Sequence, residues 1–298
     1  MLYVLLGLIV LLIALLAALW LASNTLIARR KPDAPASPAD HGLPYEDASF
    51  TTGDGLTLGG WYIPAPEIPP SHRADAARTV VVCSGHNGSM DSDLGVAPWL
   101  HAAGFDVLMF DWRGRGRSQG RRTSMGALER LDLLAAVDFA RSRGAGRTGV
   151  LGFSMGGAVA LSTAASCPGI DAVCSDGGFA RIDSAVTCGL RERGVSESLA
   201  AIAGSAIVTV AGLRLGIDLR QADPLRWAGG IAPRLVLFIH GERDPLVPIA
   251  EVEAMLALCG EPKQLWRVRE AGHRDIHERQ PEEYRRRVID FFSRALGA

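Results

Sequence analysis

The sequence predicts an α/β fold with a mostly parallel central sheet and helices on both faces. From about residue 47 onward, short apolar runs alternate with longer amphipathic segments, a pattern typical of strands that are joined through helices. The runs are rich in β-branched residues and nearly continuous, as expected for strands buried on both faces. With 298 residues, of which 48% are hydrophobic, the chain is long enough to bury a large core.

The individual elements follow from this pattern. The predicted strands are 56–63, 79–84, 105–110, 148–153, 172–174, 234–240 and 264–269. The predicted helices are 96–103, 127–143, 155–166, 249–259 and 281–296. In parallel sheets the chemistry collects at the carboxyl ends of the strands. The loops that follow these strands are therefore where functional side chains are expected.

The N-terminus carries a separate signal. Residues 1–28 contain no charged side chain, and 2–22 are almost wholly apolar, long enough to cross about 30 Å of hydrocarbon. Trp20 lies where an interfacial aromatic is expected, and Arg29, Arg30 and Lys31 form a basic stop. These features predict a single-pass transmembrane anchor in contact with membrane lipid; a cleaved signal peptide is the alternative. The basic cluster favours a cytoplasmic location for the rest of the chain.

Two further regions complete the predicted organisation. Residues 29–46 are basic and then proline-rich, which predicts a stiff linker before a folded domain at 47–298. Within that domain, about 178–232 is an insertion between two strands. Its segment 198–215 is strongly apolar and is interpreted either as a core helix or as a hydrophobic wall or membrane-facing cap.

Composition excludes several functions. The 31 basic and 32 acidic residues nearly balance, and the absence of a long basic run after residue 31 argues against nucleic acid as a partner. The five cysteines do not have the spacing of a disulfide framework or a zinc ribbon.

A candidate nucleophile lies at the end of strand 148–153. Gly152-Phe153-Ser154-Met155-Gly156 matches G-x-S-x-G, in which small residues allow a tight strand-to-helix turn that exposes the serine hydroxyl. Such a serine needs a general base, and the base needs a carboxylate to orient it. Asp244 follows strand 234–240, and His273 follows strand 264–269, which gives the order serine, acid, histidine.

Other assignments remain open at this point. Glu242 and Asp223 are reserve acids, although Asp223 precedes a proline and suits a turn. His277 follows His273 by four residues, so the two could share a helix face and bind a metal, but no third ligand is evident.

Taken together, these motifs resemble the α/β-hydrolase superfamily, and within it the single-domain ABHD-type esterases, with prolyl-oligopeptidase-like peptidases as relatives. The matching segments are 55–64 (an early hairpin), 111–118 (D-x-R-G-x-G-x-S), 152–157 (the nucleophile elbow), 240–248 (H-G-x-x-D-x-x-V-P) and the Gly-His pair at 272–273. The resemblance implies an α/β-hydrolase fold in which the 178–232 insertion forms a small lid.

The resemblance also implies roles for individual residues: Ser154 as nucleophile, Asp244 as acid and His273 as base. The oxyanion hole is expected from the backbone N–H groups of Met155 and His86. Ser84 stands where the family usually has histidine, which leaves the second donor less defined than the first. The arginines of segment 111–118 suit a structural loop better than an anion site.

We therefore expect a membrane-anchored serine hydrolase that needs no cofactor and cleaves a small-molecule acyl ester, with lipid-like acyl groups favoured by the anchor and the apolar insertion. One alternative is a serine peptidase for short or blocked peptides. Another is a membrane-tethered interaction protein without catalytic activity.

Overall fold

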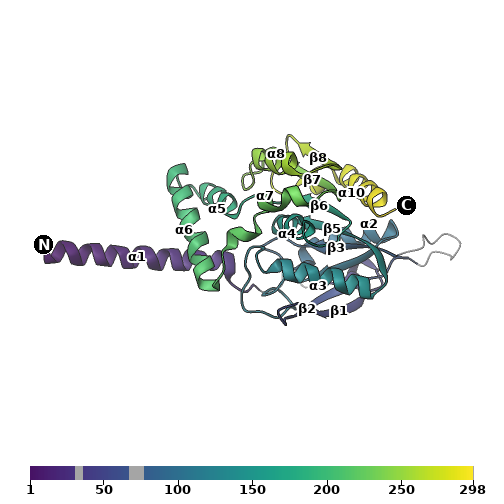
Figure 1. The fold of residues 1–298 in the computed structure, drawn as a ribbon, viewed down its shortest axis with the longest axis horizontal. Helices are drawn as coiled ribbons and strands as arrows, with labels where there is room; N and C mark the ends of the chain where they lie inside the picture. The colour runs from purple at the N-terminus through teal and green to yellow at the C-terminus, as the bar shows by residue number, and fades with distance from the viewer. Residues whose placement is uncertain (31–35, 67–76, 298) are drawn as a thin grey trace.

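The computed structural model describes residues 1–30, 36–66 and 77–297, and within them the chain forms one eight-stranded sheet. The order across the sheet is β1-β2-β4-β3-β5-β6-β7-β8 (Figure 1). The strands are β1 (Glu46–Thr51), β2 (Thr57–Ile63), β3 (Ala77–Cys83), β4 (Asp106–Phe110), β5 (Ala145–Phe153), β6 (Ala172–Asp176), β7 (Leu235–Gly241) and β8 (Lys263–Val268).

The sheet is mostly parallel, as the sequence predicts. β2 runs antiparallel to both of its neighbours, β1 and β4, while the pairs from β4 across to β8 are all parallel. The carboxyl ends of β3, β5, β6, β7 and β8 consequently meet at one edge. This edge carries the loops in which the candidate site residues lie.

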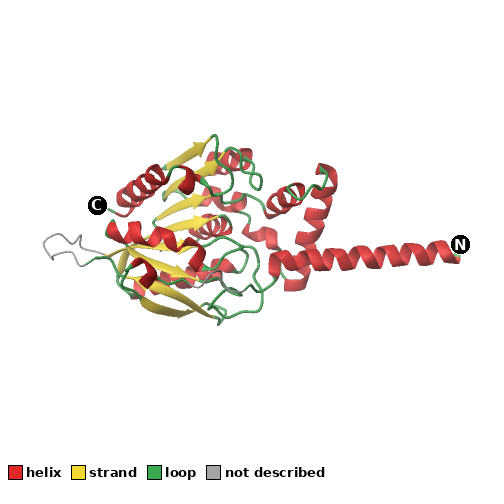
Figure 2. Ribbon diagram, turned by 180° about the vertical axis from the view of Figure 1, so that it is seen from behind, coloured by secondary structure: helices red, strands yellow, loops and turns green. Residues whose placement is uncertain are grey.

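Helices cover both faces of the sheet (Figure 2). One core forms against α3 (Glu129–Ser142), α4 (Met155–Ala164) and α8 (Ile249–Leu258). A second core forms on the opposite face against α2 (Ala97–Ala102) and α10 (Pro281–Leu296), next to the short helix α9 (Ile276–Arg279). Side chains that alternate along each strand supply both cores, because successive residues of a strand point to opposite faces.

The predicted insertion lies between β6 and β7 and is helical. It contains α5 (Ile182–Arg191), α6 (Glu197–Leu215) and α7 (Pro224–Trp227), with 3₁₀ turns at Leu219–Ala222 and Ala228–Gly230. Other 3₁₀ turns are Pro38–His41 and Met90–Val96. α5 and α6 pack on each other and stand beside the domain (Figure 1).

The N-terminal apolar segment is the helix α1 (Leu2–Ile27), which projects from the domain in both views (Figures 1 and 2). In the described chain, α1 and α6 are long and apolar enough to cross a membrane, a test that a signal sequence near the N-terminus also passes. Residues 31–35 of the predicted linker lie outside the described residues.

Two details differ from the sequence prediction. Strand β1 was not expected, because its alternation rests on only two buried side chains, Ala48 and Phe50, in a polar edge strand. The strand predicted at 172–174 continues through Ser175 to Asp176, whose carbonyl accepts a hydrogen bond from the Ser154 N–H at 2.8 Å.

Candidate active site

Ser154 occupies the sharp turn between β5 and α4. Its backbone has φ 50° and ψ −113°, a conformation that residues with a Cβ atom rarely adopt. The flanking glycines make the turn possible. A Cβ on Gly152 would overlap the carbonyl oxygen of Gly156, and one on Gly156 would overlap that of Cys83 in the neighbouring strand. The turn places Ser154 at the start of α4, where a helix favours negative charge.

His273 lies between Ser154 and Asp244. Its Nε2 atom is 3.0 Å from Ser154 Oγ, and its Nδ1 atom is 2.7 Å from Asp244 Oδ2. Because a carboxylate only accepts, Nδ1–H donates to Asp244, which leaves Nε2 as the acceptor for the serine hydroxyl proton. The three sequence-predicted residues are thus within hydrogen-bond reach in the order that nucleophilic activation requires.

Backbone groups fix the acid and the histidine. The side chain of Asp244 is only 1% exposed, and its Oδ1 atom accepts hydrogen bonds from the N–H groups of Leu246 and Val247 at 2.8 and 2.9 Å. The two loops are joined by the Arg243 N–H, which donates to the Ala271 carbonyl at 2.9 Å. The acid is therefore held independently of the histidine it orients.

The other predicted acids, and the histidines near the triad, have different partners. Glu242 lies 3.4 Å from Arg267, and Asp223 accepts the Ile182 N–H at 2.9 Å. The buried His240 contacts the Val247 carbonyl. Both ring nitrogens of His273 are engaged, which does not suit a metal site shared with His277. Among the described residues, no group of three His, Cys, Asp or Glu side chains could hold a metal ion.

The two predicted oxyanion donors come from different elements next to Ser154. Met155 is the first residue of α4, where backbone N–H groups have no acceptor within the helix. His86 lies in the loop that follows β3. Together with Gly85 and Gly88 it lines the same pocket as Ser154. This is the position in which a second backbone donor was predicted.

The ring of His86 is occupied by structural contacts. Nδ1 lies 2.9 Å from an Nη atom of Arg115, and Nε2 lies 2.9 Å from the Thr25 carbonyl of α1. Arginine only donates and a carbonyl only accepts, so His86 is neutral and carries its proton on Nε2. Burial and the adjacent Arg115 charge lower the pKa of His86 to about 3.

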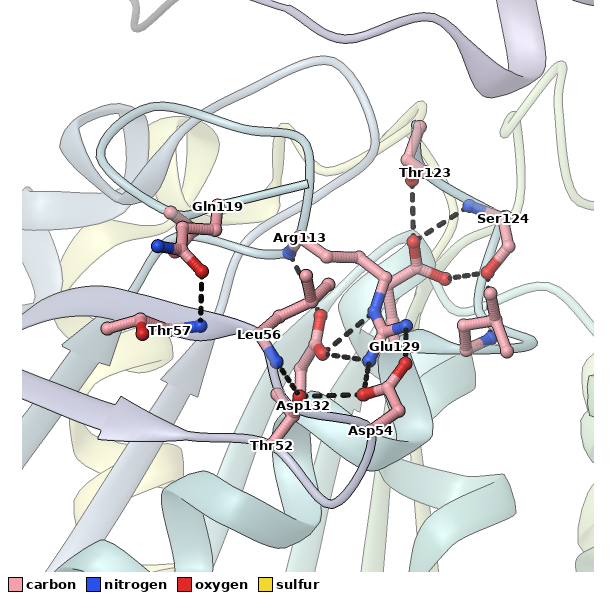
Figure 3. Close-up of polar contacts among 12 residues, drawn as sticks. Thr52, Asp54, Leu56, Thr57, Arg113, Gln119, Thr123, Ser124, Glu129 and Asp132 are labelled. Carbon is pink, nitrogen blue, oxygen red and sulfur yellow. Dashed lines mark hydrogen bonds and ion pairs between the residues drawn. The ribbon is translucent and has the colours of Figure 1, made fainter. Parts of the chain in front are cut away.

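The arginines of segment 111–118 are structural. Arg113 is buried and bridges Asp54 and Asp132, each at 2.7 Å (Figure 3). Arg117 pairs with Asp47 at 3.1 Å. Figure 3 also shows Glu129, whose carboxylate accepts hydrogen bonds from Thr123, Ser124 and Gly126 and so fixes the loop that carries Met125.

A pocket of about 490 Å³ opens above Ser154 and His273. Its charged lining residues are all arginines: Arg30, Arg193 and Arg274. Much of the wall is apolar and comes from α1, the insertion and nearby loops: Ala22, Leu26, Met125, Phe179, Ala185, Val186, Leu190, Ile207, Leu246 and Val247.

Two features of this pocket were missed by the sequence analysis. The last turns of α1 form part of the wall, which no local pattern in an apolar helix reveals. Arg274 follows His273, forms an ion pair with the buried Asp93 and lies 4.4 Å over the Phe153 ring. It therefore braces the histidine loop against the strand that leads to Ser154. The only local signal is that a cation follows the histidine.

Comparison with known proteins places the chain in a family. Residues 74–225 match the family model for serine aminopeptidase, S33. The chain is 30% identical over 258 residues to uncharacterized protein YfhR of Escherichia coli, and this alignment covers 85% of the chain and 82% of the relative. It is 30% identical over 223 residues to uncharacterized protein YqkD of Bacillus subtilis, covering 73% and 72%.

Solved structures agree with this placement. An esterase of Pyrococcus furiosus, Pf2001, superposes with a TM-score of 0.74 at 26% identity, covering 91% of this chain and 99% of the esterase. The α/β hydrolase GrgF of Penicillium has the same fold, with a TM-score of 0.68 at 23% identity over 85% of this chain and 99% of GrgF. The chain therefore belongs to the serine aminopeptidase S33 family, as an esterase-like α/β hydrolase.

Proposed function

We propose that this chain is a membrane-anchored serine esterase that cleaves carboxylic esters with lipid-like acyl groups. The observation that carries the proposal is the contact of His273 with both Ser154 and Asp244, at 3.0 and 2.7 Å, beneath a largely apolar pocket. The resemblance to the Pyrococcus esterase supports ester substrates.

The proposed reaction forms an acyl-enzyme. Ser154 Oγ attacks the ester carbonyl carbon while His273 Nε2 takes the hydroxyl proton, and Asp244 stabilises the imidazolium. The N–H groups of Met155 and His86 hold the tetrahedral oxyanion. When the intermediate collapses, the C–O bond to the alcohol breaks, and His273 returns its proton to that alcohol.

A water molecule completes the cycle. It loses a proton to His273 as its oxygen attacks the acyl carbon, and collapse of the second intermediate releases the carboxylic acid and restores the Ser154 hydroxyl. Every proton transfer uses His273 Nε2. No step of this scheme draws on a cofactor.

The anchor is proposed from α1. Its side chains from Leu2 to Leu21 are largely exposed although they are apolar, an arrangement that lipid would stabilise and water would not. Arg29, Arg30 and Lys31 follow the helix and, by the positive-inside tendency, favour a cytoplasmic catalytic domain.

The family's description also raises a peptidase. An aminopeptidase must hold the α-ammonium group of its substrate, for which a carboxylate is the usual partner. The charged residues described in the pocket lining are arginines, which would repel that ammonium group. The pocket therefore favours esters.

Labelling with a fluorophosphonate probe tests the proposal. The full chain in detergent is expected to label, Ser154→Ala is expected not to, and Ser142→Ala, an exposed serine of α3, serves as the matched control. Turnover of p-nitrophenyl esters of increasing chain length is then compared with that of aminoacyl p-nitroanilides. Labelling together with cleavage of the anilides alone would indicate a peptidase. Absence of both labelling and cleavage would indicate a tethered interaction protein.

A further inference from the structure

The direction of α1 relative to the domain is fixed by several contacts. Its last residues Leu26 and Ile27 are buried, and Ala28 pairs with Arg122. The Arg29 guanidinium donates to the carbonyls of Ser118, Gly120 and Gly116. These bonds join α1 to the loop after β4. If α1 crosses a bilayer, the domain consequently has a defined orientation to that bilayer.

A second set of contacts joins α1 to α6. Arg214, near the end of α6, donates to the Trp20 carbonyl at 2.8 Å and to Asn24 Oδ1 at 2.8 Å. Its guanidinium also lies 4.0 Å over the Trp20 ring. α6 runs across α1 rather than along it (Figures 1 and 2). The end of α6 is therefore held at the interfacial turn of α1.

The two faces of α6 differ in what they contact. On the inner face, Gly204 is so close to Thr187 of α5 that a Cβ atom would lie 2.7 Å from its hydroxyl oxygen. On the outer face, Leu199, Ile202 and Leu213 are 58%, 70% and 76% exposed. α5 lies between α6 and the domain in Figure 1, so the outer face points in the direction in which α1 projects.

We infer that α6 lies on the surface of the bilayer crossed by α1, with Leu199, Ile202 and Leu213 among the lipid headgroups, and that the substrate enters the pocket from the membrane. A helix that runs across α1 and is held at Trp20 stays at interfacial depth along its length. The packing of Gly204 and Ile207 against the protein makes a spanning orientation unfavourable, because it would separate α6 from α5.

The pocket connects this surface to the chemistry. Ala22, Thr25 and Leu26 of α1 and Ile207 of α6 line the same pocket as Ser154. The entrance therefore lies beside the helix turns at the membrane interface, at the depth where a lipid ester carbonyl is located. This entry route rests on the proposed esterase function, whereas the position of α6 rests only on the proposed membrane anchor α1.

The position of α6 is tested by fluorescence quenching. All five native cysteines are buried, so a single exposed cysteine can be labelled selectively. Ile202→Cys and, as the matched control, Arg294→Cys on α10 are labelled with a nitrobenzoxadiazole dye in the full chain. Each is reconstituted into phosphatidylcholine vesicles with bromines at shallow or deep acyl positions. Shallow bromines are expected to quench the dye at position 202, and neither depth is expected to quench at 294.

Entry from the membrane is tested by activity. Ile202→Glu is expected to lower turnover of a long-chain ester dissolved in vesicles about tenfold, given the roughly 10- to 100-fold effect of exposing one such side chain. Turnover of soluble p-nitrophenyl butyrate is expected to stay unchanged. Leu258→Glu, at an exposed leucine of α8, is the control and should leave both rates unchanged.

Several results would overturn the inference. The dye at position 202 would show no quenching at either depth if α6 lay away from the bilayer. Stronger quenching by deep bromines would indicate a spanning helix. Energy transfer to a second labelled copy would indicate that another protein molecule covers the outer face of α6. Equal vesicle rates for Ile202→Glu and Leu258→Glu would refute membrane entry. Loss of fluorophosphonate labelling and of soluble ester turnover in the wild type would instead refute the esterase proposal, and the quenching result would still stand.

Discussion

The strained backbone of Ser154 makes a prediction about stability that is opposite to the usual effect of glycine. At φ 50° and ψ −113°, any residue with a Cβ atom is strained, and glycine is not. Ser154→Ala removes the hydroxyl and keeps the strain, while Ser154→Gly removes both. Comparing the two variants with each other isolates the backbone term, because neither can bond to His273.

The magnitude follows from two opposing contributions. Relief of a strained backbone is worth about 1–3 kcal/mol. The greater freedom of glycine in the unfolded chain costs about 0.5–1 kcal/mol. Ser154→Gly is therefore expected to be more stable than Ser154→Ala by about 0.5–2 kcal/mol, which for a domain of this size raises Tm by about 1–4 °C. Thermal unfolding followed by tryptophan fluorescence in detergent measures the difference.

The control lies in the helix that follows. Ser162 is buried in α4 with ordinary helical geometry, so there Ser162→Gly should be less stable than Ser162→Ala by about 1 kcal/mol. The glycine variant should be the more stable of the two at position 154 and the less stable of the two at position 162. If Ser154→Gly also proves less stable than Ser154→Ala, the strain argument is refuted.

Four further changes test the rest of the site. Asp244→Asn is expected to lower kcat for p-nitrophenyl esters about 10⁴-fold, because the amide no longer favours the required histidine tautomer. The pKa of His86 is lowered to about 3, so the contribution of this residue to the free energy of unfolding is fully present above about pH 6.5 and is lost as the pH falls toward 3. In urea titrations, the free energy of unfolding of His86→Gln should therefore fall less steeply with decreasing pH than that of the wild type. Gly156→Ala should lower the free energy of unfolding by at least about 1–3 kcal/mol through its overlap with a neighbouring strand, measured by denaturant unfolding. Arg113→Gln should lower it by about 3–5 kcal/mol, because Asp132 is left buried without its cation, measured in the same way.

Three of these variants have a matched partner on the surface: those at Asp244, Gly156 and Arg113. Asp218→Asn should leave kcat unchanged, since that carboxylate is 47% exposed and bonds only to its own helix turn and Arg220. Gly95→Ala enters open space and should unfold like the wild type. Arg117→Gln removes an exposed ion pair worth less than about 1 kcal/mol. If a site variant has the same kcat or free energy of unfolding as its surface control, the physical reason given for its effect is refuted.

The sheet and the triad geometry could be anticipated because both depend on short-range patterns. Strands β3 and β5 each end in a run of β-branched, apolar or glycine residues, and the turn at Ser154 requires glycines that are visible in the sequence. Strand order then brings loops that are distant in the sequence to one edge. His273 and Asp244 therefore lie within reach of Ser154 once the sheet is mostly parallel.

The contacts around the pocket entrance could not be anticipated in this way. α1 is apolar on every side, so its sequence does not distinguish the turns that project from the domain from the turns that line a pocket. The outward side chains of α6 have the same composition as its buried ones, and only packing on α5 separates them. His86 could be placed after β3, but its bond to Thr25 joins residues 61 positions apart.

The hydrogen bond between His86 and Thr25 has a consequence for how α1 and the proposed reaction depend on each other. The backbone N–H of His86 is the proposed second oxyanion donor, and its ring connects Arg115 to the Thr25 carbonyl of α1. The Thr25 carbonyl is the acceptor of the His86 Nε2–H, so displacing α1 would remove that hydrogen bond and free the ring to move. Neutral His86 thus connects the position of α1 on the domain to the loop that would hold the oxyanion. Because the same turn of α1 lines the pocket, α1 contributes to the shape of the candidate active site.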